Sequence, residues 1–126
     1  MAHEFCHVEL LTGDVGKAKK FYKGLFGWDL EDLSIGNGQI YTAIKPGSGP
    51  GGGMMMKPEP QIPTGWFVYV NVKDLKKSVK KAAKLGAKVI NPGQPVPGWG
   101  AFAVLVDPTG AVINLWEAKR KTKKKK

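Results

Sequence analysis

Apolar and polar side chains alternate along two stretches of the chain, and each stretch leads into a segment with helical spacing. Every second residue is apolar in residues 6–11 and again in residues 67–72, which predicts two strands. An aspartate follows each strand, Asp14 in the first case and Asp74 in the second, and a glycine comes about a dozen residues later. Because aspartate caps helix N-termini and glycine ends helices, the pattern predicts a strand followed by a helix, twice.

Each predicted helix has one apolar face, formed by residues three and four positions apart. The first face consists of Val15, Ala18, Tyr22 and Leu25, and the second of Leu75, Val79, Ala82 and Leu85. The lysines of the second helix fall largely on its opposite side; they are Lys76, Lys77, Lys80, Lys81 and Lys84. This placement favours a solvated helix surface over a stripe that binds nucleic acid.

Three short strand-like runs follow each helix, so the chain is predicted to contain an internal repeat. Moving the sequence by the 60 positions that separate Asp14 from Asp74 superposes the two copies. Asn37-Gly38 predicts a hairpin turn, and Asp107-Pro108-Thr109-Gly110 predicts a type I turn. The predicted fold is α+β, with one βαβββ module in residues 1–57, a proline-rich linker in 58–63 and a second module in 64–118.

Length and composition narrow the class of protein further. The 126 residues suffice for one domain, or for two small halves that share a core. The single cysteine cannot form an internal disulfide, and the first residues lack the basic and apolar regions of a secretory leader, so we expect a cytoplasmic protein. No apolar run approaches the roughly 18 residues of a membrane span, so no membrane partner is expected. Of the formal charge of +10, seven positive charges lie in the predicted disordered tail 119–126, which leaves +3 for residues 1–118.

Three segments occur in a characteristic order: HVELLTGDVGKAKKFYKGLFGW near the start, WFVYVNVKDLKKSVKKAAKLGAKV in the middle and DPTGAVINLWE near the end. Together they resemble the glyoxalase/bleomycin-resistance/extradiol-dioxygenase superfamily, also called the vicinal oxygen chelate proteins, over about residues 5–118. The resemblance implies that the strands of two tandem βαβββ modules curl into an incomplete eight-stranded barrel around a ligand cavity. It also implies a homodimer, which is common in the superfamily.

Enzymes of this superfamily hold a divalent metal with ligands from the first and last strands of each module, and this chain matches that pattern at His7 alone. The equivalent position of the second module is Phe67, and the last strand has Asn114 where the enzymes typically have glutamate. Glu117 comes three residues later, on the opposite face, and the remaining position falls near Met56. Because such a metal needs about three or four nitrogen and oxygen donors, we expect no cofactor, and a divalent metal is disfavoured.

Strand alternation predicts which side chains face the cavity. On the first strand Val8 and Leu10 share the side that meets the helix, so His7 and Glu9 face the other way. The residues predicted to line the cavity are His7, Glu9, Phe67, Tyr69, Asn114 and Trp116. Broad aromatic walls with a few polar groups are typical of sites for small organic molecules.

The pair His7 and Glu9 is the candidate for chemistry. A buried carboxylate needs a compensating partner, and a histidine two residues away on the same face can supply one. A proton relay between acid and base and a plain structural hydrogen bond both fit this pattern, and both stay open. For His7 taken alone, a structural place in the core is the simpler alternative.

Two glycine-rich segments have other expected roles. The triplet Gly51–Gly53 lacks the lysine and hydroxyl residue of a phosphate-binding loop and is predicted to form a mobile turn between strands. The segment Asn91–Gly100 contains three prolines and is predicted to be a loop long enough to cover the cavity mouth. Trp99 in this loop is a candidate ligand contact.

The sequence therefore predicts a glyoxalase-like protein that binds a small organic molecule, by sequestration or with modest acid/base catalysis through His7 and Glu9. A second reading is a metal-dependent lyase or isomerase of the lactoylglutathione lyase type, using these residues with ligands placed elsewhere. A third is an accessory protein that binds nucleic acid through the lysine-rich tail, which the placement of the charge disfavours.

Overall fold

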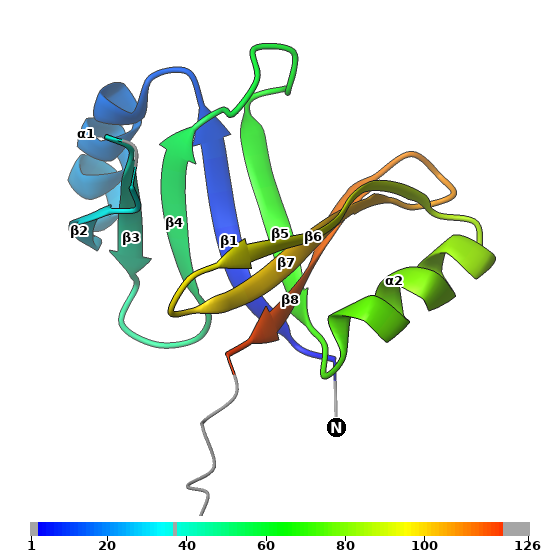
Figure 1. The fold of residues 1–126 in the computed structure, drawn as a ribbon. Helices are drawn as coiled ribbons and strands as arrows, with labels where there is room; N and C mark the ends of the chain where they lie inside the picture. The colour runs from blue at the N-terminus through cyan, green and yellow to red at the C-terminus, as the bar shows by residue number, and fades with distance from the viewer. Residues whose placement is uncertain (1–2, 37, 120–126) are drawn as a thin grey trace, which may run out of the picture. The chain divides into compact units, whose positions relative to one another are not determined.

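The computed structural model describes residues 3–36 and 38–119, which contain eight strands and two helices. The chain divides into two compact units. The first unit is Cys6–Val68, and the second unit combines the residues through Phe5 with the chain from Tyr69 onward. Figure 1 shows the course of the chain through both units.

The first unit has the predicted order of one strand, one helix and three strands. Its elements are β1 (Phe5–Thr12), α1 (Val15–Phe26), β2 (Asp29–Ser34), β3 (Ile40–Lys45) and β4 (Gly51–Met56). The strands lie in the order β2-β3-β4-β1. The pairs β2/β3 and β3/β4 are antiparallel, and β4 pairs with β1 in parallel.

The predicted signals for the start and end of α1 are confirmed. The Asp14 carboxylate accepts a hydrogen bond from the backbone N–H of Lys17 at 2.9 Å, which satisfies one of the free donors of the first turn. Gly27 ends the helix with a left-handed φ of 68°, and its N–H donates to the carbonyl of Lys23. Local sequence is therefore enough to set both ends of α1.

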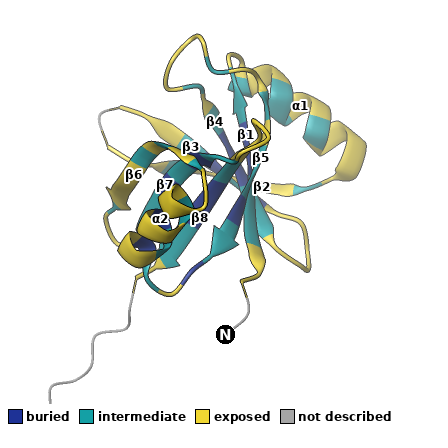
Figure 2. Ribbon diagram, turned by 90° about the vertical axis from the view of Figure 1, so that its right-hand side faces the viewer, coloured by how far each residue is buried: buried dark blue, intermediate teal, exposed yellow. Residues whose placement is uncertain are grey.

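The core of the first unit lies between α1 and the sheet. Its fully buried members are Leu10, Ile44 and Met54, and Val15, Ala18 and Tyr22 of α1 pack against them. The predicted apolar face of α1 is wrong at Leu25, because this side chain is 58% exposed. No residue of α1 is fully buried, which Figure 2 shows as a helix without the colour of buried residues.

The second unit repeats the pattern. Its elements are β5 (Gly65–Asn71), which begins in the first unit, α2 (Leu75–Lys84), β6 (Lys88–Val96), β7 (Gly100–Val106) and β8 (Val112–Ala118). The strands lie in the order β5-β8-β7-β6, with β5 parallel to β8 and the other pairs antiparallel. Two βαβββ modules thus confirm the predicted α+β class.

The core of the second unit is larger than that of the first. Its buried residues come from α2 and from the strands beneath it: Val72, Leu75, Val79, Ala103, Leu105 and Leu115. Asp74 caps α2 by accepting from the N–H of Lys77, as predicted, and Gly86 follows the helix with φ 104°. Leu85 is the exception on the predicted helix face, since it is exposed. The five lysines of α2 are exposed, as the solvated face requires.

Both glycine-rich segments differ from their predictions. Gly51–Gly53 is part of strand β4 and forms no turn, because β4 is held between β1 and β3 on both sides. A Cβ at Gly52 would lie 2.5 Å from the backbone oxygen of Val8, so this close strand approach requires glycine.

The predicted loop Asn91–Gly100 is mostly strand. β6 continues to Val96 with two register shifts, and only residues 97–99 form a turn before β7. Prolines are tolerated there because β6 ends the strand order of the second unit and its bulges leave backbone donors unpaired.

The two predicted turns have different outcomes. At the second, Gly110 N–H donates to the carbonyl of Asp107 at 2.9 Å, which confirms a hydrogen-bonded turn. Thr109 and Ala111 donate to the Asp107 carboxylate and lower the pKa of this side chain. The hairpin turn at Asn37-Gly38 includes residue 37, which lies outside the described residues.

Candidate functional site

A part-buried hydrogen-bond network on the first unit joins three side chains from two strands into one polar site. His7 and Glu9 lie two residues apart on β1, and the hydroxyl of Tyr41 on β3 lies between them. The Tyr41 oxygen is 2.6 Å from Nε2 of His7, and its hydroxyl donates to Oε1 of Glu9 at 3.3 Å. The structure thus brings the predicted pair together through a third residue.

Sequence reasoning missed Tyr41, and Gly53 explains how this side chain reaches β1. Strand β4 lies between β3 and β1, with Gly53 paired to Glu9 on one side and to Ala43 on the other. A Cβ placed on Gly53 would lie 2.0 Å from the Tyr41 hydroxyl oxygen and 2.1 Å from the ring carbon that bears it. The Tyr41 ring therefore crosses β4 over a position where only glycine leaves room. The signal in the sequence was an aromatic residue on one strand and a glycine triplet on the next.

The electrostatics of the network favour a neutral histidine. Burial lowers the pKa of His7 below its ordinary value of 6.5, because an imidazolium would lose solvation there. The Tyr41 hydroxyl has a single hydrogen, which it donates to Glu9. The 2.6 Å contact between His7 Nε2 and the Tyr41 oxygen is a second hydrogen bond, whose donor depends on the tautomer of the imidazole. Glu9 is only 9% exposed, so its hydrogen bonds replace most of its water.

In the second unit, Tyr69, Asn114 and Trp116 lie on the strand faces away from α2. Tyr69 is opposite Asn114 in the β5/β8 register. Its ring packs edge to face against Phe102 of β7, with 6.2 Å between the ring centroids. Trp116 is opposite Phe102 in the β7/β8 register. The alternation predicted for this strand is confirmed, since Ile113 and Leu115 pack into the core beneath α2 on the other face.

Asn114 is the least satisfied polar group in the part of the chain that the structure describes. It is 5% exposed, and its Oδ1 accepts no hydrogen bond from any described residue. Burying an amide oxygen without a donor is unfavourable by about 1–3 kcal/mol. Such a group usually has a reason in function, and Asn114 therefore becomes a candidate ligand contact on physical grounds.

Phe67 and Trp99 are the two remaining candidates. Phe67 is half-buried on β5, within the first unit. Trp99 is exposed at the turn before β7, where its N–H donates to the carbonyl of Val96 and its own carbonyl accepts from Lys119. The cavity that the sequence predicts between the two modules, and the lid role of Trp99, stay predictions.

A divalent metal needs a cluster of about three or four nitrogen and oxygen donors. Nowhere in residues 3–36 and 38–119 do three or more His, Cys, Asp or Glu side chains gather closely enough to hold an ion. His7 Nε2 is bonded to a tyrosine hydroxyl, and the position with a family glutamate has Asn114, a weaker donor. The described donors do not fit a divalent metal of the type that the superfamily's enzymes use.

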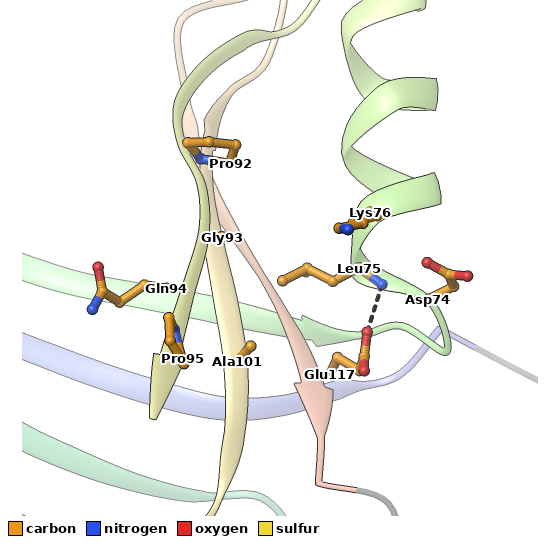
Figure 3. Close-up of a pocket in the computed structure, with 9 residues that line it drawn as sticks. All are labelled: Asp74, Leu75, Lys76, Pro92, Gly93, Gln94, Pro95, Ala101 and Glu117. Carbon is orange, nitrogen blue, oxygen red and sulfur yellow. Dashed lines mark hydrogen bonds between the residues drawn. The ribbon is translucent and has the colours of Figure 1, made fainter. Parts of the chain in front are cut away.

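A separate pocket of about 620 Å³ in the second unit lies beside the N-terminus of α2 (Figure 3). Its walls include the carboxylates of Asp74 and Glu117 and the bulged segment of β6. Glu117 Oε1 accepts from the N–H of Leu75 at 2.7 Å, and Asp74 accepts from Lys77. Both acids thus cap α2. This capping role explains why the Glu117 side chain does not face the side of Asn114.

The geometry defines a class of protein: an α+β protein of two βαβββ modules with a part-buried polar network on the first. Residues 5–115 match the family described as the Glyoxalase/Bleomycin resistance protein/Dioxygenase superfamily. The chain belongs to this superfamily, which confirms the resemblance drawn from its motifs.

Relatives with similar sequences include proteins from bacteria and a fungus. The chain is 38% identical over 107 residues to CFP32 of Mycobacterium tuberculosis, whose name describes it as a proposed glyoxylase; the match covers 85% of this chain and 41% of that protein. It is 33% identical to a glyoxylase-like domain-containing protein of Didymella fabae, over 75% of this chain and 80% of that one. The chain thus spans about two-fifths of the mycobacterial relative's length.

Solved structures share the fold at low sequence identity. A hypothetical protein from Bacillus halodurans superposes with a TM-score of 0.75 at 14% identity, covering 98% of this chain and 99% of that one. Methylmalonyl-CoA epimerase from Mycobacterium tuberculosis superposes with a TM-score of 0.69 at 17% identity, covering 92% and 88%. These likenesses show the fold.

Four other expectations concern partners and location. Neither α1 nor α2 has the length and apolar character that a helix needs to cross a membrane. The lysine-rich tail falls outside the described residues from position 120, so binding of nucleic acid through it stays a prediction. The homodimer and the cytoplasmic location also stay predictions.

Proposed function

We propose that the chain binds a small organic molecule through the network of His7, Tyr41 and Glu9, and that it does so without a metal. The observation that carries this proposal is the Tyr41 hydroxyl held between an imidazole and a carboxylate. A neutral imidazole, a phenol and a carboxylate in series offer both donors and acceptors to a polar group of a ligand. The same series can pass a proton between Glu9 and His7, so modest acid/base chemistry is part of the proposal.

The second unit offers a polar contact of its own at Asn114. Its buried Oδ1, which lacks a donor among the described residues, would accept a hydrogen bond from a ligand hydroxyl or amine. Tyr69 and Trp116 of the same unit would add aromatic surface. The relative DauV of a Streptomyces strain, 28% identical over 86% of this chain, is named for anthracycline biosynthesis, which supports testing planar ring compounds first.

The test is a thermal-shift screen of the full chain against quinones, sugars, amines and antibiotics, in the presence of a chelator. A ligand that binds the native state raises the melting temperature, whatever its chemistry. We expect at least one compound to do so, and we expect Tyr41→Phe and Glu9→Gln to weaken its binding by about tenfold or more, as loss of a buried hydrogen bond to a charged group does.

The matched control is His3→Ala against His7→Ala, because His3 is exposed and its Nδ1 contacts the backbone oxygen of Asn71. His7→Ala is expected to abolish binding, and His3→Ala to leave it unchanged. Binding that survives Tyr41→Phe, Glu9→Gln and His7→Ala alike would contradict the proposal.

Asn114→Leu separates function from folding. Leucine has a similar volume and no polar atom, so we expect the variant to be as stable as the parent or more stable. Ligand binding is expected to weaken in the same variant. A large loss of stability would instead show that Asn114 serves the fold.

A further inference from the structure

A second cavity, separate from the polar network, lies on the opposite side of the first unit's sheet. It has a volume of about 430 Å³ and is lined only by residues between Val8 and Trp66. Val8 is one of its walls, and the alternation of β1 puts Val8 on the face opposite to His7 and Glu9. This volume is within the range of small-molecule sites.

Four aromatic rings line this cavity, those of Tyr22, Phe26, Trp28 and Trp66. Tyr22 and Phe26 of α1 are nearly parallel, with an angle of 17° between their planes, and Tyr22 and Trp28 differ by 20°. Trp66 stands almost perpendicular to them, at 81° to Tyr22 and 80° to Trp28. Its indole N–H donates to the Tyr22 hydroxyl at 3.2 Å, which fixes the two rings relative to each other. The rings thus form a fixed corner, in which Trp66 stands nearly perpendicular to Tyr22 and Trp28.

The internal repeat shows that the fold does not need these aromatic residues. The constant shift of the repeat gives the counterpart of Tyr22. The counterparts of Phe26 and Trp28 follow from aligning Gly27 with Gly86, the glycines that end the two helices. The aromatic positions and their counterparts in the second unit are Tyr22 and Ala82, Phe26 and Leu85, and Trp28 and Ala87. Among these smaller residues, Ala82 packs against the core of the second unit, and Leu85 is exposed. The aromatic set of the first unit is therefore additional to what the fold requires.

Exposure and charge indicate what the cavity accepts. Phe26 is 56% exposed and Trp66 is 38% exposed, so ring surface faces solvent at its mouth. Every residue that lines the cavity is uncharged, and Gly51 and Gly52 contribute backbone without side chains. A charged ligand would find no counter-ion there, whereas a flat apolar ligand could stack on one ring and meet Trp66 with its edge.

We propose that this cavity binds a flat, uncharged ring compound, at a site distinct from the network of His7, Tyr41 and Glu9. The probe for the test is N-phenylnaphthylamine, an uncharged dye of linked aromatic rings whose emission rises in apolar surroundings. It is titrated into the full chain and its variants, with circular dichroism and melting temperature as controls for folding. We expect saturable binding of one dye per chain.

The variants use the repeat as a guide. Tyr22→Ala and Phe26→Leu install the residues that the second unit has at these positions, so the fold is expected to tolerate them. Both are expected to weaken dye binding by about tenfold, through lost stacking surface. Trp116→Leu is the matched control, because it removes an aromatic residue of the other predicted site, and it is expected to leave dye binding unchanged.

Three outcomes would overturn the proposal. Dye binding that is absent in the parent chain, or that persists in both Tyr22→Ala and Phe26→Leu, would show that the cavity takes no such ligand. Binding lost with Trp116→Leu and kept in the other two would move the dye to the other site. Sedimentation that shows a dimer of the parent chain and a monomer of Phe26→Leu would show that this face is covered by a second copy.

Discussion

In the second unit α2 buries Leu75 and Val79 against its sheet, whereas in the first unit α1 buries no residue completely (Figure 2). Both units follow the same pattern of strand, capped helix and three strands. They differ in what the two faces of the sheet carry. The second unit has a continuous aliphatic core, while the first has a polar network on one face and an aromatic cavity on the other.

In our proposal, the duplicated scaffold separates stability from function. Aliphatic packing against α2 stabilises the second unit, and its acids Asp74 and Glu117 serve to cap the helix. In the first unit the buried polar residues bond to one another, an arrangement that contributes little to net stability compared with aliphatic packing. We therefore expect substitutions to affect stability most in the second unit and binding most in the first.

The largest difference in stability is expected between two leucine substitutions, one on each helix. Leu75→Ala in α2 should lower the free energy of unfolding by about 2–5 kcal/mol, because it leaves a cavity in the core of the second unit. Leu25→Ala in α1 should change it by about 0.5 kcal/mol or less, because Leu25 is mostly exposed. Urea unfolding of both variants measures the contrast, and equal losses would contradict the difference between the units.

A glycine substitution is expected to have the next largest effect. Gly53→Ala should destabilise the chain by about 1–3 kcal/mol, because the new methyl group overlaps the Tyr41 ring and pushes it off β4. The control is Gly51→Ala on the same strand, whose methyl group would lie 3.4 Å from the nearest atom, the backbone oxygen of Ile44.

The NMR signals of the His7 ring report on its environment. They would not shift if Gly53 served the structure of the strand alone. Gly53→Ala should shift these signals as strongly as Tyr41→Phe does. Unchanged His7 signals in Gly53→Ala would contradict the positioning role of Gly53.

Helix capping by Glu117 is expected to have a smaller effect. Glu117→Ala should lower the free energy of unfolding by about 0.5–2 kcal/mol, because the N–H of Leu75 loses its acceptor and the helix N-terminus loses a favourable charge. Glu117→Gln keeps an acceptor oxygen and should restore part of the loss. Equal destabilisation by both variants would show that the charge, and not the hydrogen bond, is what matters.

The smallest effect is the pH dependence that His7 adds to stability. Since burial lowers the pKa of His7 below 6.5, the unfolded chain binds a proton there at higher pH than the folded chain. The free energy of unfolding should therefore decrease as the pH falls through 6.5 toward the lowered pKa, by at most about 1.4 kcal/mol per pH unit from this group.

Urea unfolding of the parent chain, His7→Gln and His3→Gln across this range measures the effect. The decrease should be shallower in His7→Gln and unchanged in His3→Gln. Parallel curves for all three proteins would contradict it.

The elements that could be predicted from the sequence are those set by local signals. The two capping aspartates, the glycine after each helix and the alternation of β1, β5 and β8 all depend on neighbours in the chain, and the structure confirms each of them. The family resemblance rested on the same ordered signals. For that reason it predicted the fold, whereas the alternation of β1 predicted the face of His7 and Glu9.

The features that could not be predicted depend on which strands become neighbours. Tyr41 reaches His7 because β4 lies between β3 and β1, an order that neither segment encodes alone. Gly53 looks like part of a turn until the Tyr41 ring is seen above it. Prolines in β6 suggested a loop, because edge position and bulges are properties of the assembled sheet.

The central claim is that this member of the superfamily works through a hydrogen-bond network in the first unit and holds no metal centre there. Metal analysis of the full chain, purified without a metal-affinity tag, tests the claim most directly. We expect metal far below one ion per chain, with no difference between the parent chain and His7→Ala. Stoichiometric metal that is lost with His7→Ala and kept with His3→Ala would contradict the account and favour a metal-dependent lyase or isomerase.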